Sequence, residues 1–97
     1  MTTISSTQSP IKGLNYDTRR FSVKFKVGKS MSPEEYHQLI SPDLALLFKA
    51  MYSTIDGDIV TIIGPVPYAL EKEYLITQLN SLAKKHNATV LKIIEEV

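Results

Sequence analysis

Few residues in this sequence have the types and the spacing that catalysis or metal binding requires. Glu34 and His37 stand three positions apart, which on a helix places a carboxylate and an imidazole on one face, as in the Glu-x-x-His half-motif of di-iron proteins. Such a centre needs a second copy of the motif and further carboxylates, and the sequence contains one copy. We therefore predict a glutamate at a helix start beside a surface histidine, and no metal site.

Two glycine-containing segments match ligand loops only in part. The Asp-Gly-Asp segment at 56–58 begins like a calcium loop, but the twelfth position from Asp56 is Pro67, where a bidentate glutamate is required. A turn is the better prediction there. The Gly64–Pro67 segment stands between an expected strand and an expected helix, where open α/β sheets collect ligands. Its two prolines lack the N–H donors of a phosphate cradle, so phosphate or small-ligand binding at Gly64–Pro67 is a lesser alternative.

The rest of the sequence offers no recognisable set of catalytic residues. The 97 residues include no cysteine, which excludes thiolate nucleophiles, thiolate zinc sites and disulfides. Neither a Gly-x-Ser-x-Gly turn nor a paired serine and histidine motif occurs. We expect a protein that is not an enzyme and needs no cofactor, and the absence of cysteine makes the cytoplasm the default location.

Basic residues are concentrated near the start of the chain. Six of the 11 basic residues but only one of the 10 acidic residues lie in segment 1–32, although the whole chain has a net charge of +1. Such asymmetry suggests an anionic partner such as nucleic acid, whereas the alternative is that the charges protect an exposed edge strand from aggregation. The candidate contacts to nucleic acid are Arg19, Arg20, Lys24, Lys26 and Lys29, with Tyr16 as a nearby stacking ring.

These basic residues require a strand to position them. Residues 20–27 alternate strictly, with Phe21 and Phe25 on the apolar side and Lys24 and Lys26 on the other, which predicts a half-buried strand. The phenylalanines thus face away from the basic side, and this pattern differs from the aromatic platforms of single-strand binders. The sequence alone therefore supports non-specific contact at most.

Two successive helix starts follow this strand. Ser32, Pro33 and Glu35 form a capping box with proline at the first helical position. Ser41 and Pro42 repeat the cap-and-proline order, which predicts that the first helix stops or kinks near residue 40 and that a second runs from 42 to about 53.

The expected second helix has almost no polar stripe. Its buried face would use Leu44, Leu47, Phe48 and Met51. We predict that the residues left over, Leu46, Ala50 and Tyr52, contact another protein chain, because one small domain cannot wrap a helix on all sides.

The second half of the chain predicts a strand, a helix and a strand. Residues 59–63 form a continuous β-branched run typical of a central strand, residues 68–86 a helix with Asn87 as a left-handed C-cap, and residues 88–94 a last strand. The expected fold is α/β (or α+β), a single domain whose three-stranded, mainly parallel sheet follows a β-α-α-β-α-β order with helices packed on it. If the crossovers step the same way, the polar side of the first strand is left uncovered, with Thr61 and Lys92 as its neighbours.

The domain is expected to span 16–97, after a flexible polar tail at 1–15. No apolar run approaches the length of a membrane span, so no membrane partner is expected. The leading hypothesis is a non-enzymatic small interaction protein, either a homodimer or an accessory subunit of a larger assembly. The second is a nucleic-acid-binding module that uses the basic first strand.

Overall fold

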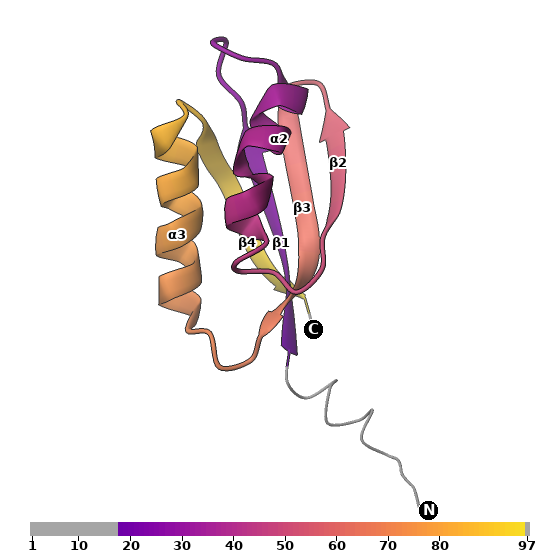
Figure 1. Cartoon of the computed structure of the whole chain (residues 1–97), viewed down its shortest axis with the longest axis vertical. Coiled ribbons are helices and arrows are strands. Elements are labelled where there is room, and N and C mark those ends of the chain that lie inside the picture. Colours follow the sequence, from indigo (N-terminus) through magenta and orange to yellow (C-terminus); the bar gives the residue numbers. More distant parts are fainter. Residues whose placement is uncertain (1–17, 97) are drawn as a thin grey trace, which may run out of the picture.

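The computed structural model describes residues 18–96, and in this part of the chain two helices lie on one side of a four-stranded sheet (Figure 1). The predicted tail at 1–15 and Tyr16 lie outside the described residues. The elements in chain order are β1 (Thr18–Lys26), α2 (Pro33–Leu44), β2 (Tyr52–Asp56), β3 (Ile59–Pro67), α3 (Lys72–Lys85) and β4 (Thr89–Glu96).

The sheet is antiparallel throughout, with the strand order β2-β3-β1-β4. The predicted three-stranded, mainly parallel sheet in β-α-α-β-α-β order is therefore wrong. The described chain is α+β and follows a β-α-β-β-α-β order, which is the ferredoxin-like, split β-α-β arrangement. β1 and β3 occupy the two inner positions of the sheet. The connection through α2 therefore crosses β3 to join β1 to β2, and the connection through α3 crosses β1 to join β3 to β4.

The error arose in segment 42–53, where the second helix was expected. Pro42 lies within the last turn of α2, and the hydroxyl of Ser41 donates to the carbonyl oxygen of His37 (2.6 Å). Proline removes one backbone N–H and disfavours a helical residue before it. Even so, α2 continues through Pro42 and ends two residues later, at Leu44. The chain then turns and enters β2.

A two-residue hairpin joins β2 to β3. Asp56 pairs with Ile59, and Gly57 takes a φ of 63°. A glycine with positive φ at the first central position is typical of a type II′ hairpin turn. The turn predicted at 56–58 is confirmed, but the strand that precedes it had been taken for the end of a helix.

The core lies between the sheet and the helices. On the sheet side it contains Phe21, Val23, Phe25, Val60 and Ile62, all fully buried. On the helix side it contains Tyr36, Ile40, Leu75 and Leu79. The alternation predicted for the first strand is thus confirmed, since the odd-numbered residues of β1 face the helices and its even-numbered residues, among them Lys24 and Lys26, face away.

Tyr36 is the largest fully buried side chain. Its ring meets the Phe25 ring edge-on at 5.6 Å between centroids, and its hydroxyl donates to the carbonyl oxygen of Leu82 at 3.4 Å. Burial disfavours the charged phenolate and raises the pKa of Tyr36 to about 12.

Local signals place the helix ends. The capping box at Ser32 is present in both directions, because the Ser32 hydroxyl accepts from the Glu35 N–H (3.1 Å) and the Glu35 carboxylate accepts from the Ser32 N–H (2.9 Å). Asn87 follows α3 with a φ of 59°, as predicted for a left-handed residue after a helix. However, α3 begins at Lys72 and not at Tyr68, because β3 continues to Pro67.

Candidate functional site

The side of the sheet that faces away from both helices (Figure 1), which we call the open face, carries three of the basic residues of β1, namely Arg20, Lys24 and Lys26. Strand register places its side chains in rows across the sheet. One row is Tyr52, Ile63, Ser22 and Ile94, and the next is Thr54, Thr61, Lys24 and Lys92. The expectation that Thr61 and Lys92 would flank the polar side of the first strand is confirmed, in an antiparallel sheet.

Lys24 and Lys92 lie directly opposite each other on β1 and β4. Like charges in this position destabilise a sheet, so the pair is unfavourable for folding alone. The Lys24 ammonium group leans the other way, toward β3, and donates to the Thr61 hydroxyl at 3.1 Å. Lys26 follows on the same face of β1 and is exposed. Three lysines therefore share the middle and one end of the open face.

Arg20 lies at the other end of the open face and is paired. Its Nε lies 2.9 Å from the Glu96 carboxylate, and both side chains are well exposed. A solvated pair of this kind contributes about 0–1 kcal/mol, and the Glu96 carboxylate offsets much of the arginine's charge. Arg20 therefore contributes less to the positive potential of the open face than the three lysines do.

Tyr52 adds an aromatic ring to the open face. It lies on β2 opposite Ile63, and 65% of its surface is exposed. A hollow of about 170 Å³ lies next to it, lined by Tyr52, Ala50, Arg20 and Ile63. Tyr52 was predicted as an interface residue on a helix and not as a neighbour of the lysines. The signal that would have placed it is the strand pattern that precedes the Asp-Gly turn.

The three predicted interface residues do not form one surface. Ala50 and Tyr52 line the hollow beside the open face, whereas Leu46 lies in the turn after α2 and is 83% exposed. Leu46 lines a different groove of about 250 Å³, together with Leu70 and Tyr74. The prediction depended on a helix without a polar stripe, but no helix spans segment 45–51.

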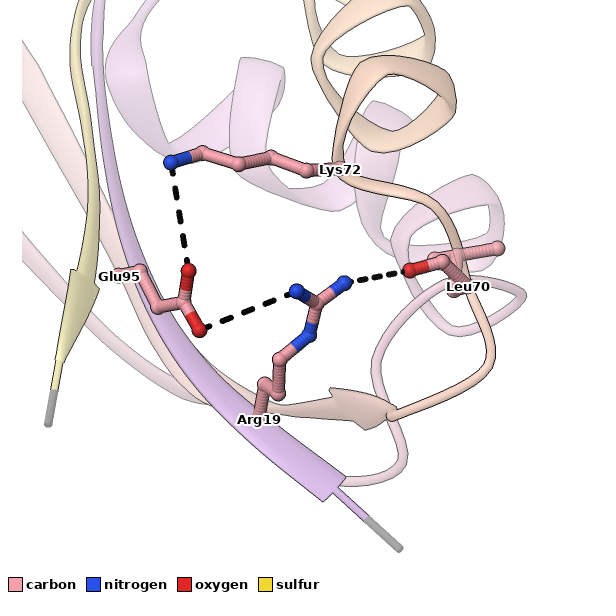
Figure 2. A network of polar contacts seen from close by, with 4 residues as sticks. All are labelled: Arg19, Leu70, Lys72 and Glu95. Carbon is pink, nitrogen blue, oxygen red and sulfur yellow. Dashed lines mark hydrogen bonds and ion pairs between the residues drawn. The ribbon is translucent and has the colours of Figure 1, made fainter.

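Arg19 lies on the helix side of the sheet, away from the other predicted basic residues. Its guanidinium donates to the carbonyl oxygen of Leu70 (2.8 Å) and lies 4.0 Å from the Glu95 carboxylate, which Lys72 also approaches at 4.0 Å (Figure 2). The guanidinium carbon is 5.2 Å from the centre of the Tyr68 ring. These contacts tie β1, β4 and the segment before α3 together, so Arg19 has a structural role in the described chain.

The remaining sequence candidates lie elsewhere. Lys29 is exposed in the segment between β1 and α2, and Tyr16 lies outside the described residues. The Gly64–Pro67 segment belongs to β3 and is not a loop, which removes the geometry on which a ligand site there depended.

His37 lies on α2 and contacts β2. Its Nε2 lies 2.9 Å from the Ser53 hydroxyl and so links α2 to β2. Among residues 18–96, no group of three or more histidine, aspartate or glutamate side chains is placed to hold a metal ion. Within the same range, no helix has the length and apolar character needed to cross a membrane.

Comparisons with models of protein families, with curated proteins and with solved structures found no match to this chain. The open face must therefore be interpreted from its own geometry and charge.

Proposed function

We propose that this protein is a non-enzymatic binding module whose open face holds single-stranded nucleic acid. The observation that supports this most is the Lys24–Lys92 pair, which lies in the middle of a sheet face that neither α2 nor α3 covers. Two lysines at directly opposed positions on neighbouring strands weaken the isolated fold, and an anionic ligand offsets their repulsion.

The spacing of the lysines suits a phosphate backbone. Lys24 and Lys26 project from the same side of one strand about 7 Å apart, and Lys92 lies about 5 Å away on the next strand. Three long, flexible lysine side chains that leave the backbone at this spacing provide neighbouring contacts for a chain of phosphates that crosses the sheet. The face also includes the exposed hydroxyl group of Thr54, which can donate to phosphate or sugar oxygens.

The uncharged part of the open face suits unpaired bases. The exposed Tyr52 ring lies in a row with Ile63 and Ile94, which is 44% exposed. An aromatic ring at a sheet surface stacks on an unpaired base whatever its sequence, whereas the bases of a duplex are already stacked on each other. We therefore infer a preference for single strands over duplexes, with little sequence selectivity.

A charge-reversal experiment tests this function. Fluorescence anisotropy with labelled oligo(dT) and oligo(U) should show binding by the full chain that weakens as salt increases. With about three phosphate contacts, the logarithmic salt slope should be about −2. In Lys24→Glu/Lys26→Glu this binding should be lost.

The matched control is Lys84→Glu/Lys85→Glu, which makes the same change of charge at the exposed end of α3. It should retain most of the affinity. Equal losses in the two double variants would show that net charge alone drives binding and would reject the open face as the site.

Tyr52 provides a second, independent test. Replacement by alanine removes the stacking ring and should weaken binding about tenfold, whereas Tyr52→Phe keeps the ring and should bind nearly as well as the original chain. If Tyr52→Ala binds normally, the lysines act without a stacking platform and the proposed mode is wrong.

The hypothesis of a homodimer or accessory subunit rested on an apolar helix at 42–53, and that helix does not exist.

A further inference from the structure

Within residues 18–96, β4 is an edge strand that pairs with β1 on one side only. It is eight residues long and contains neither proline nor glycine. Leu91 and Ile94 are 48% and 44% exposed on it. The pairing of β4 with β1 shifts register between Lys92 and Val90, so the regular part of this edge is segment 92–96, whose outward backbone groups are a template for pairing with another strand. We propose that β4 pairs antiparallel with β4 of a second copy of this chain, joining two sheets into one.

The order of charges along β4 makes this edge complementary to itself. A two-fold axis perpendicular to the sheet keeps both open faces on the same side, so open-face residues of one copy meet open-face residues of the other. When Ile94 lies on the axis, it faces Ile94 of the second copy, and Lys92 faces Glu96 at both ends. Opposite charges and apolar groups in directly opposed positions both stabilise antiparallel pairs.

The neighbouring registers are less favourable. With Lys92 on the axis, the two ammonium groups of Lys92 would oppose each other. With Ile93 on the axis, Lys92 would face Ile94 and the carboxylate of Glu95 would face Leu91. The register centred on Ile94 also places Glu95 opposite Ile93, but of these three registers it alone brings Lys92 opposite a carboxylate, so the charge pattern selects it.

Two further features favour this edge over the opposite one. In the proposed dimer, Glu96 lies between Arg20 of its own chain, already 2.9 Å away, and Lys92 of the second copy. A nearby carboxylate also offsets the repulsion between Lys92 and Lys24. The other edge strand, β2, has five residues and offers no pair of opposite charges, because self-pairing about Thr54 would place Tyr52 opposite Asp56.

Cysteine cross-linking tests the register, since the chain has no cysteine of its own. In the proposed dimer the two Ile94 Cα atoms lie about 4.5–5.5 Å apart, within the range that a disulfide spans. Ile94→Cys should therefore give a covalent dimer under mild oxidation. Thr54→Cys on β2 and Thr89→Cys at the start of β4 are the matched exposed controls, and both should remain monomeric on a non-reducing gel.

Charge exchange tests the proposed contacts without a covalent bond. Sedimentation equilibrium should show a dimer for the original chain. The dissociation constant should rise about tenfold in Lys92→Glu and in Glu96→Lys, because each places like charges opposite each other, and should recover in the double variant. These measurements contain no nucleic acid, so they can fail while the binding proposal survives.

Three outcomes would overturn the proposal. The first is a monomer at the highest attainable concentration, and the second is cross-linking of Thr54→Cys as fast as that of Ile94→Cys. The third is a double charge variant that is as weak a dimer as the single ones.

Discussion

Replacing Lys24 by glutamate should stabilise the folded protein and at the same time weaken nucleic-acid binding. The residue is exposed on the open face, directly opposite Lys92. The change turns a repulsive cross-strand pair into an attractive one, and each such term is worth about 0.2–1 kcal/mol. The present hydrogen bond from Lys24 to Thr61 has a substitute, since a glutamate at position 24 can accept from the Thr61 hydroxyl.

The expected gain in unfolding free energy is about 0.5–1.5 kcal/mol at low salt, which for a domain of this size raises Tm by several degrees, at about 4–8 °C per kcal/mol. Urea unfolding followed by circular dichroism measures the gain, and oligonucleotide anisotropy measures the loss of binding. The gain should shrink in high salt, because the lysines are exposed to solvent.

Lys26→Glu is the matched control for this prediction. It makes the same change of charge on the same strand, but the neighbours of Lys26 across the sheet are Ile59 and Thr89, so no repulsion is relieved. It should weaken binding with little change in stability. A Lys24→Glu variant that is less stable than the original chain, or that binds as tightly, would refute the reasoning that the lysine pair costs stability and serves a ligand.

Three further predictions concern the fold that supports the open face. The pKa of Tyr36 is raised to about 12, so its contribution to stability is complete below pH 10 and is lost as the pH rises from 10 to 12. Unfolding free energy should fall there by about 2–3 kcal/mol, and Tyr36→Phe should remove this part of the pH dependence. Gly64→Ala would drive a methyl group against the carbonyl oxygen of Ala50, which the hydrogen bond from the Lys49 N–H to the Pro65 carbonyl (2.9 Å) holds in place. Urea unfolding should show a loss of at least about 2 kcal/mol, and a loss below 0.5 kcal/mol would show that the segment moves freely. Ser32→Ala should cost about 1 kcal/mol by the same assay through loss of the cap on α2, whereas Ser30→Ala, just before the cap, should cost almost nothing.

Local patterns in the sequence predicted several elements well. Alternation in β1 placed Phe21 and Phe25 in the core and Lys24 outside, because a strand with one covered face admits only one assignment. The capping box at Ser32 and the left-handed Asn87 were also predicted, since each depends on a few neighbouring residues.

The topology was not predictable from these local signals. Segment 44–52 is apolar at nearly every position, a pattern that fits a buried helix as well as a turn followed by a strand. In the structure Leu44 and Phe48 are buried while Leu46 and Ala50 are exposed, and the chain reverses onto β3. That path depends on the close approach of Ala50 to Gly64, a contact between distant residues that no local pattern contains.

The candidate site was predicted in part for the same reason. Lys24 and Lys26 followed from the strand, and Lys92 was expected beside them, but Tyr52 joins them only through the pairing of β2 with β3. Arg19 was named as a candidate contact to nucleic acid together with Arg20, although it lies one residue from Arg20 and therefore points to the opposite face of the strand. The alternation of the strand already contained that information.

The most direct test of the proposed binding face is an NMR titration of the full chain with a short single-stranded oligonucleotide. We expect the largest shift changes at side chains of the open face, above all Tyr52, Thr61 and the lysine ammonium groups of β1 and β4. Residues on the outer surfaces of α2 and α3 should change little. Changes concentrated on the helices, or no changes at low salt, would contradict the account.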